Sequence, residues 1–291
     1  MLIASGSWGL YWLPQRFLME QGFSGGWGTI AQYLISMAFL LPFALWRLIR
    51  RRGIGLQYWV SGLLLGSGAI FYANSFLYTE VIRALIFFYL TPLWATLFEV
   101  FFLKRALNKS RVWSIILSVI GVWIAVGLDV GVPIPIMLGD WFGLLGGLLI
   151  SAGAVRSEME QPNGVFPLLF IVVSFCLLMS LCHYPFLTEK VGVIPSLEII
   201  IVNLPSMIAI AVLFVIPTTA ILFWSPSRIG AGVFGILILM ELVVGVVSAA
   251  ILTDESFGLR EVFGVSLIVI ASVVEIKFNN PNRHSQLENG K

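Results

Sequence analysis

The stretch IRALIFFYLTPLWATLFEVFFLKRALNKSRVWSIILSVIGVWIAV, residues 82–126, decides the fold of this chain. An apolar run that contains Pro92 ends at a basic turn with Arg105, and a second apolar run follows the turn. The pattern recurs as RIGAGVFGILILMELVVGVVSAAILTDESFGLREVFGVSLIVIASVVE, residues 228–275. Setting Pro92 against Leu242 places Arg105 opposite Glu255, so two copies of one hairpin carry opposite charges at their turns.

The composition indicates a membrane protein. Hydrophobic residues make up 59% of the 291 residues and charged residues only 11%, whereas a soluble domain carries about 25% charged residues. Apolar runs of about 20 residues recur, and each is long enough to cross a hydrocarbon core of roughly 30 Å. These runs are continuous, while a transmembrane barrel shows ~10-residue segments of alternating hydrophobicity. We therefore expect an all-α polytopic membrane protein.

Ten apolar spans can be marked along the chain. They are Leu2–Leu18, Gly26–Leu48, Tyr58–Leu77, Ala84–Leu103, Val112–Leu128, Trp141–Ala154, Val165–Leu187, Ile199–Phe223, Ile229–Leu252 and Val262–Ile276. The sixth span is expected to extend past Arg156. Five spans precede Gly139 and five follow it, and five is odd, so the second half enters the membrane in the opposite sense.

The charges predict the orientation. Lys and Arg in short loops stay on the cytoplasmic side, and the basic residues after the second and fourth spans lie on one side if both termini are cytoplasmic. The location expected is a bacterial-type inner (plasma) membrane. Residues 1–138 are predicted to form a first five-helix repeat and 139–278 a second, inverted five-helix repeat, followed by a disordered cytoplasmic tail at 279–291. Ten transmembrane helices in two inverted repeats are typical of alternating access.

Several of these residues resemble a known family. Trp8-Gly9 is similar to the opening of the ten-helix, EamA-type branch of the drug/metabolite transporter (DMT) superfamily. The two copies of its hairpin pattern correspond to Leu90-Thr91-Pro92 with Arg105 and Gly121, and to Met240-Glu241-Leu242 with Glu255 and Gly264. The chain departs from the family at Arg105, where a glutamate is frequent, and at Leu242, which replaces the second proline. The resemblance implies a membrane transporter and leaves its solute open.

Glu241 is the main candidate for a functional side chain. It lies about halfway along the ninth span, where a carboxylate costs at least ~2.5–3.5 kcal/mol on insertion scales and should therefore face a cavity or a partner. It is expected to bind the solute or a proton, and the alternative is a structural hydrogen bond to a neighbouring helix. A second acid, Glu99, lies close to the basic turn and is expected to pair with Lys104 or Arg105.

Aromatic and amide side chains form a second group of candidates. Trp8, Tyr11 and Gln15 share one helical face, next to Trp12. Two rings opposite a carboxylate suit an organic cation or a zwitterion through cation–π attraction of roughly 0.5–2 kcal/mol, and the alternative is an interfacial aromatic belt. The remaining substrate-binding candidates, for which bonding between helices is an equal alternative, are Tyr72, Asn74, Tyr78, Tyr89 and Thr91.

These observations favour a secondary active transporter of a small polar metabolite, working by alternating access and either coupled to protons or exchanging solutes. The alternatives are a flippase for a lipid or lipid-linked substrate, or a membrane-embedded enzyme. Enzyme activity is not expected, because no nucleophile–base set or metal-ligand spacing surrounds either histidine, His183 or His284. No cofactor, metal or nucleic acid is expected. The expected partners are a small-molecule substrate, the lipid bilayer and protons, with a homodimer left open.

Overall fold

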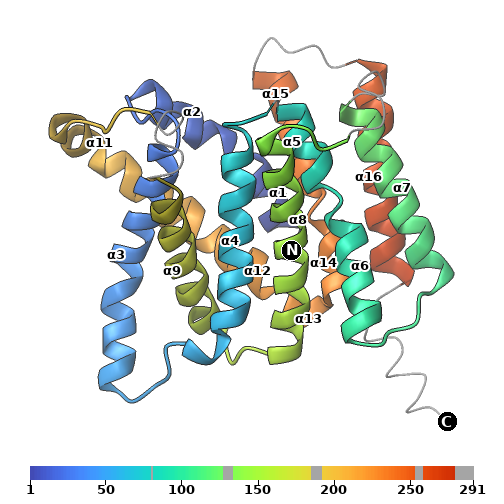
Figure 1. Cartoon of the computed structure of the whole chain (residues 1–291), viewed down its shortest axis with the longest axis horizontal. Helices are drawn as coiled ribbons and strands as arrows, with labels where there is room; N and C mark the ends of the chain where they lie inside the picture. Colours follow the sequence, from blue (N-terminus) through green and yellow to red (C-terminus); the bar gives the residue numbers. More distant parts are fainter. Residues whose placement is uncertain (80, 127–133, 185–191, 253–257, 279–291) are drawn as a thin grey trace.

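The computed structural model describes residues 1–79, 81–126, 134–184, 192–252 and 258–278, and within them the chain is helical (Figure 1). The helices of the first half are α1 Leu2–Gly9, α2 Trp12–Glu20, α3 Trp27–Ile49, the 3₁₀ turn η1 Leu56–Tyr58, α4 Trp59–Ser75, α5 Val81–Phe88, α6 Thr91–Phe102 and α7 Lys109–Val126. Those of the second half are α8 Leu138–Glu160, α9 Val165–His183, α11 Leu197–Ile210, the π-helix η4 Ala211–Val215, α12 Ile216–Trp224, α13 Pro226–Ile229, α14 Ala231–Leu237, α15 Met240–Leu252 and α16 Leu259–Phe278.

The described residues of the ten predicted spans lie mostly on one helix or on consecutive helices, and residues 127–128 and 185–187, at the ends of the fifth and seventh spans, lie outside the described ranges. Six segments are long and apolar enough to cross a membrane: Trp27–Ile49, Arg83–Phe102, Leu138–Glu160, Val165–His183, Leu197–Ile229 and Ala231–Leu252. The extension of the sixth span past Arg156 is confirmed, because α8 continues to Glu160. These helices establish an all-helical integral membrane protein.

Three predicted spans are broken in the middle. The first breaks between α1 and α2, the fourth between α5 and α6, and the ninth between α14 and α15. Pro14 accounts for the first break, because it has no N–H to donate to the carbonyl of Leu10, four residues earlier. Pro92 has the same effect on the carbonyl of Phe88. The breaks of the fourth and ninth spans lie inside the protein, because Tyr89, Ile238 and Leu239 are buried.

The contacts distinguish two groups of helices, which we call the two bodies. In one body α8 packs against α4, α5 and α6; in the other α1 packs against α12 and α15. Glycines make both contacts close: a Cβ at Gly147 would lie 2.6 Å from the carbonyl oxygen of Phe88, and a Cβ at Gly9 would overlap the carbonyl oxygen of Glu241. Small residues of this kind let helix backbones approach within a membrane.

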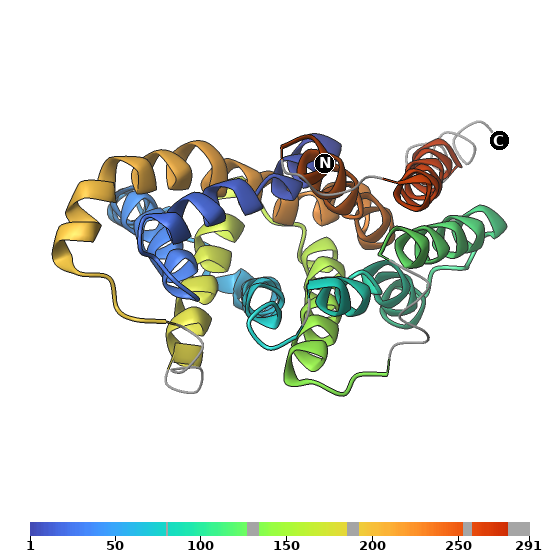
Figure 2. The same ribbon diagram turned by 90° about the horizontal axis from the view of Figure 1, so that it is seen from above.

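Two pairs of helices complete the arrangement. α7 lies against α16 at one edge of the molecule in both views (Figures 1 and 2), and a Cβ at Gly121 would lie 2.9 Å from the carbonyl oxygen of Gly264. The two glycines named in the hairpin motifs therefore meet at one interface. α3 packs against α9 on the other side of the two bodies.

The loops after α3, α6 and α8 lie at one end of the molecule, which is the lower end in Figure 1. The basic residues of the second and fourth loops, from Arg47 to Arg52 and from Lys104 to Arg111, therefore lie at the same end. This agreement with the predicted charge segregation does not extend to Glu255 or to the tail at 279–291, which lie outside the described residues.

Candidate functional site

At the break of the fourth span, between α5 and α6, side-chain hydroxyl groups bond to backbone carbonyl groups. The Thr91 hydroxyl donates to the carbonyl oxygen of Phe88 over 2.5 Å, which is the acceptor that Pro92 leaves without an amide partner. The Ser151 hydroxyl of α8 lies 3.1 Å from the carbonyl oxygen of Thr91. Thr91, a predicted substrate-binding residue, therefore satisfies backbone at the break with its hydroxyl.

The broken ninth span, α14–α15, contains no proline, and a neighbouring helix supplies a hydrogen-bond donor to its backbone. The Ser5 hydroxyl of α1 donates to the carbonyl oxygen of Leu237, the last residue of α14, over 3.0 Å. Gly9, one turn further along α1, lies against the carbonyl of Glu241. Helix α1 thus stabilises the break between α14 and α15 through contacts with its backbone. These contacts account for a break in this span although Leu242 replaces the proline.

Glu241 lies in the first turn of α15, directly after this break, and is only 7% exposed. The Tyr72 hydroxyl of α4 donates to its Oε1 over 3.0 Å, and Tyr89, at the break of the fourth span, lies close to the same carboxyl group. The Tyr72 ring stacks on Phe88 with centroids 3.7 Å apart. Three predicted residues from three separate spans therefore converge, and the carboxyl group joins the two bodies.

A stack of aromatic rings lies at the break of the first span. The rings of Trp8 and Tyr11 are parallel with centroids 4.7 Å apart, and Phe214 of η4 extends the stack, 6.1 Å from Tyr11. The amide of Gln15 donates to the Tyr11 hydroxyl, which donates to Oε1 of the buried Gln32 over 2.6 Å. The predicted face of Trp8, Tyr11 and Gln15 is thus assembled, and the sequence analysis missed Phe214 and Gln32.

A proline three residues later could have drawn attention to Phe214 in the sequence. Pro217 has no N–H to donate to the carbonyl of Leu213, and the turn before it is a π-helix. Turns of this kind occur mostly singly and often at functional sites. Gln32, in the second span, is an uncharged polar residue in an apolar run, and such residues need partners inside a membrane.

The other predicted residues lie apart from these two groups. The Trp12 indole donates to the Ser248 hydroxyl over 3.0 Å and ties α2 to α15. The Asn74 amide lies 2.8 Å from Nδ1 of His183 on α9, and the Tyr78 ring contacts Phe142 of α8 with centroids 5.9 Å apart. Within ranges 1–79, 81–126, 134–184, 192–252 and 258–278, no group of three His, Cys, Asp or Glu side chains is placed to hold a metal.

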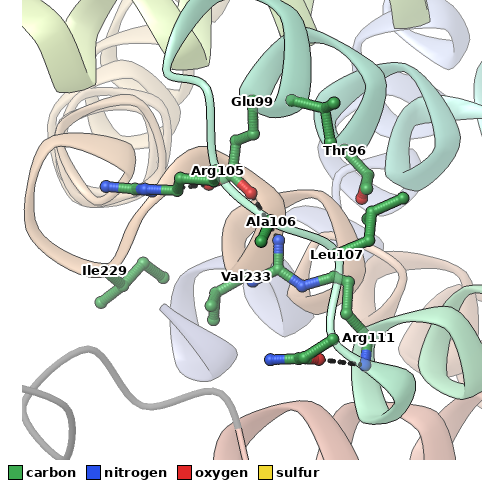
Figure 3. A pocket seen from close by; sticks show the side chains of 10 residues that line it. Thr96, Glu99, Arg105, Ala106, Leu107, Arg111, Ile229 and Val233 are labelled. Atoms are coloured by element: carbon green, nitrogen blue, oxygen red, sulfur yellow. Dashed lines mark hydrogen bonds and ion pairs between the residues drawn. The ribbon is translucent and has the colours of Figure 1, made fainter.

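Ion pairs connect helices at both ends of the molecule. At the upper end of Figure 1, Arg83 makes a two-pronged contact with the buried Asp140 at the start of α8, 3.1 and 2.6 Å long. At the lower end Glu99 accepts from Arg105 over 2.9 Å and from Arg111, so the predicted partner Arg105 is found. A cavity of about 350 Å³ opens beside these three side chains (Figure 3).

The fold and the broken helices define the class as an integral membrane protein with polar groups gathered at interrupted spans, an arrangement typical of transporters. Residues 1–127 match the model of the EamA-like transporter family. The resemblance to the EamA-type branch of the DMT superfamily is thereby confirmed, and it indicates a membrane transporter. The matched residues cover most of the first predicted repeat.

A solved structure described as "Crystal structure of protein" is similar over 94% of both chains, with a TM-score of 0.67 and 17% sequence identity. At this identity the likeness shows a shared fold. No curated protein matches the sequence.

Proposed function

We propose that this protein is a secondary active transporter that moves a small polar metabolite across the inner membrane by alternating access. The observation that carries the proposal is the meeting of two broken helices at one buried carboxyl group. Broken helices in corresponding positions of two halves form the solute sites of many transporters. Here the breaks follow Phe88 and Leu237, and Glu241 lies just after the second break, hydrogen-bonded to Tyr72 and close to Tyr89.

The contacts support two inverted five-helix repeats, 1–138 and 139–278. Under the proposed repeat, α1 corresponds to α8, α4 to α11–α12, and α5–α6 to α14–α15. The packing of α8 on α4 and α5–α6 then corresponds to the packing of α1 on α12 and α15. The pairs α7–α16 and α3–α9 each join a helix to its own counterpart, and the pair α6–α14 joins the broken fourth span to the broken ninth span. This is the contact pattern that a twofold axis between the repeats would produce.

The direction of the broken helices supports the inversion. α6 ends near Glu99 and Arg105, and α14 begins beside them, since a Cβ at Gly230 would lie 3.4 Å from the Arg105 guanidinium and 3.5 Å from the Glu99 carboxylate. The two broken spans therefore run in opposite directions. With the basic end on the cytoplasmic side, both termini are proposed to be cytoplasmic.

The chemistry of the groups favours a cationic or zwitterionic solute, amino-acid-like or an organic cation. Glu241 offers a carboxylate to an ammonium group, and the rings of Trp8 and Tyr11 attract cations through their faces. Because Glu241 of one body is held by Tyr72 of the other body, a change of its partners is able to bias their relative position. Exchange of a proton for the solute at this carboxyl group would couple transport to a pH gradient.

The test is uptake of a labelled metabolite panel into proteoliposomes, with and without a pH gradient. We expect saturable uptake of one solute class, and loss or uncoupling of that uptake in Glu241→Gln. Glu20→Gln is the matched control, because Glu20 lies in an exposed pair with Arg16 at the end of α2. Wild-type uptake with unchanged pH dependence in Glu241→Gln would remove this residue from the mechanism. Movement of a labelled lipid, with no uptake of any metabolite, would favour the flippase.

A further inference from the structure

We propose that Glu99, Glu158 and Arg105 form a latch that closes the basic end of the path between the two bodies; the proposal rests on the transport function above. The sequence analysis noted Arg105 as a departure from the family and predicted it only as a candidate partner of Glu99. In the structure its guanidinium joins two buried carboxylates: Nη1 lies 2.9 Å from Glu99 and Nη2 lies 2.5 Å from Glu158.

Both carboxylates are almost completely covered by protein. Glu99 is 3% exposed and Glu158 is 8% exposed. A buried carboxylate is costly unless it is paired and hydrogen-bonded, and removing one partner leaves an uncompensated charge. Arg105 itself is half exposed. Its charge is therefore placed to hold the two acids together while water reaches the other face of its side chain.

The carboxylates hold the start of α14, which belongs to the other body. Glu158 Oε2 accepts the amide N–H of Ala231 over 2.8 Å. On the other side, a Cβ added at Gly232 would overlap both the Arg111 guanidinium and the Glu99 carboxylate. The chain from Gly230 to Gly232 thus fits between the acids because Gly232 lacks a side chain, and Gly230 has a φ of +89° that favours glycine.

Arg111, which donates to Glu99, connects the latch to the helices that support it. Arg111 also lies 2.7 Å from Glu275, which is fully buried on α16. This pair joins α7 to α16, whose backbones meet at Gly121 and Gly264. We assign Arg111 and Glu275 to the static support, and Arg105, Glu99 and Glu158 to the contact that opens when α14 moves away from α6 and α8.

The latch and the carboxyl site lie on the same broken helix. α14 runs from Ala231 at the latch to Leu237 at the break, and Glu241 follows in the first turn of α15. A movement that withdraws α14 from the acids would therefore also shift the backbone that positions Glu241. Opening of the basic end and a change at the solute site would occur in one step.

Cysteine labelling tests the latch without a transported solute. The reporter is Val233→Cys, a buried position that lines the cavity, in a chain whose native Cys176 and Cys182 are replaced by alanine and serine. We expect the maleimide labelling rate to rise by at least about tenfold in Arg105→Gln, because the change removes both ion pairs and the loss of even one hydrogen bond to a charged group has an effect of that size. A similar rise is expected in Gly232→Ala, whose new methyl group separates the acids from α14.

The matched control is Arg156→Gln. Arg156 pairs with Glu160 on the same helix and at the same end, 2.7 Å apart, but the pair lies within α8 and joins no second body. Its labelling rate is expected to equal that of the reporter alone. Ala231→Pro is a second test, because proline is tolerated at the first position of a helix and removes only the amide donor to Glu158.

Unchanged labelling in Arg105→Gln, Gly232→Ala and Ala231→Pro, all with wild-type elution in gel filtration, would overturn the latch. The labelling experiment and the uptake experiment can fail separately. If no metabolite is taken up and the labelling rate still rises, the latch stands and the transport proposal fails. If uptake is saturable and the labelling rate is constant, transport stands and the latch is wrong.

Discussion

At the scale of single residues, the carboxyl group of Glu241 has the most consequence. It is 7% exposed, the Tyr72 hydroxyl of the opposite body donates to it, and Tyr89 of that body lies close to it. A hydroxyl group is a neutral donor that gives way to a charged ligand at little cost, unlike an arginine. Tyr72 therefore satisfies the carboxyl group without competing strongly with an ammonium group.

Removing the Tyr72 hydroxyl tests this arrangement. In Tyr72→Phe, Glu241 loses a donor 3.0 Å away while the ring stack on Phe88 is retained. We expect the KM for uptake of the identified solute to change by about tenfold, the size of one hydrogen bond to a charged group. Tyr184→Phe is the control, because the Tyr184 ring packs edge-on against Trp27. An unchanged KM in Tyr72→Phe would show that its hydroxyl has no part in binding.

Much of the candidate site could be named from the sequence, residue by residue, because a polar side chain in an apolar run is rare. Glu241, Tyr72 and Tyr89 were selected on that ground. Their mutual contact could not be predicted, because it depends on how three spans cross. Phe214 was missed because a phenylalanine in an apolar span gives no signal of its own. Glu158 and Glu275 were missed for another reason: both lie at span ends, where acids are common.

At the scale of helices, two breaks at corresponding places arise from different causes. Pro92 accounts for the first. The second depends on Ser5 and Gly9 of α1, which reach the backbone of α14 and α15. The sequence therefore allowed the first break to be anticipated from its proline, whereas the second follows from a tertiary contact that no local pattern reveals.

Closing the space at Gly9 tests the second cause. In Gly9→Ala, the new Cβ overlaps the carbonyl oxygen of Glu241 and lies 3.0 Å from the amide nitrogen of Gly245. We expect the free energy of unfolding to fall by about 1–3 kcal/mol, the cost of overpacking a tight contact, measured by unfolding in detergent followed through tryptophan fluorescence. Gly53→Ala should be neutral, because nothing lies within 4 Å of its Cβ. Equal stability of the two variants would contradict a close α1–α15 contact.

At the scale of the whole molecule, the charges and the packing agree on two distinct ends. The basic loops gather at the end where α6 and α14 meet, and Arg83 and Asp140 join α5 to α8 at the other. The all-helical class was predictable because long apolar runs indicate it. The grouping of the helices was not predictable, because one body combines α8 with α4, α5 and α6, and the other combines α1 with α12 and α15.

The orientation can be measured with cysteines next to the two matched turns. In a chain without Cys176 and Cys182, Leu107→Cys should react only with a reagent inside the cell, and Glu255→Cys with an impermeant reagent outside. The reason is that an odd number of spans per repeat inverts the second copy. Arg51→Cys marks the cytoplasmic side. Labelling of both turn positions from one side would exclude the inverted arrangement.

The bond between Ser5 and Leu237 has a consequence for biosynthesis. The first helix leaves the ribosome long before the segment to which it bonds, because 232 positions separate the donor Ser5 from the acceptor Leu237. Until the ninth span is inserted, the Ser5 hydroxyl of this first helix lacks its acceptor at Leu237. Neither half is therefore a self-sufficient folding unit, and the last stage of assembly is the docking of the oldest part of the polypeptide onto one of the newest.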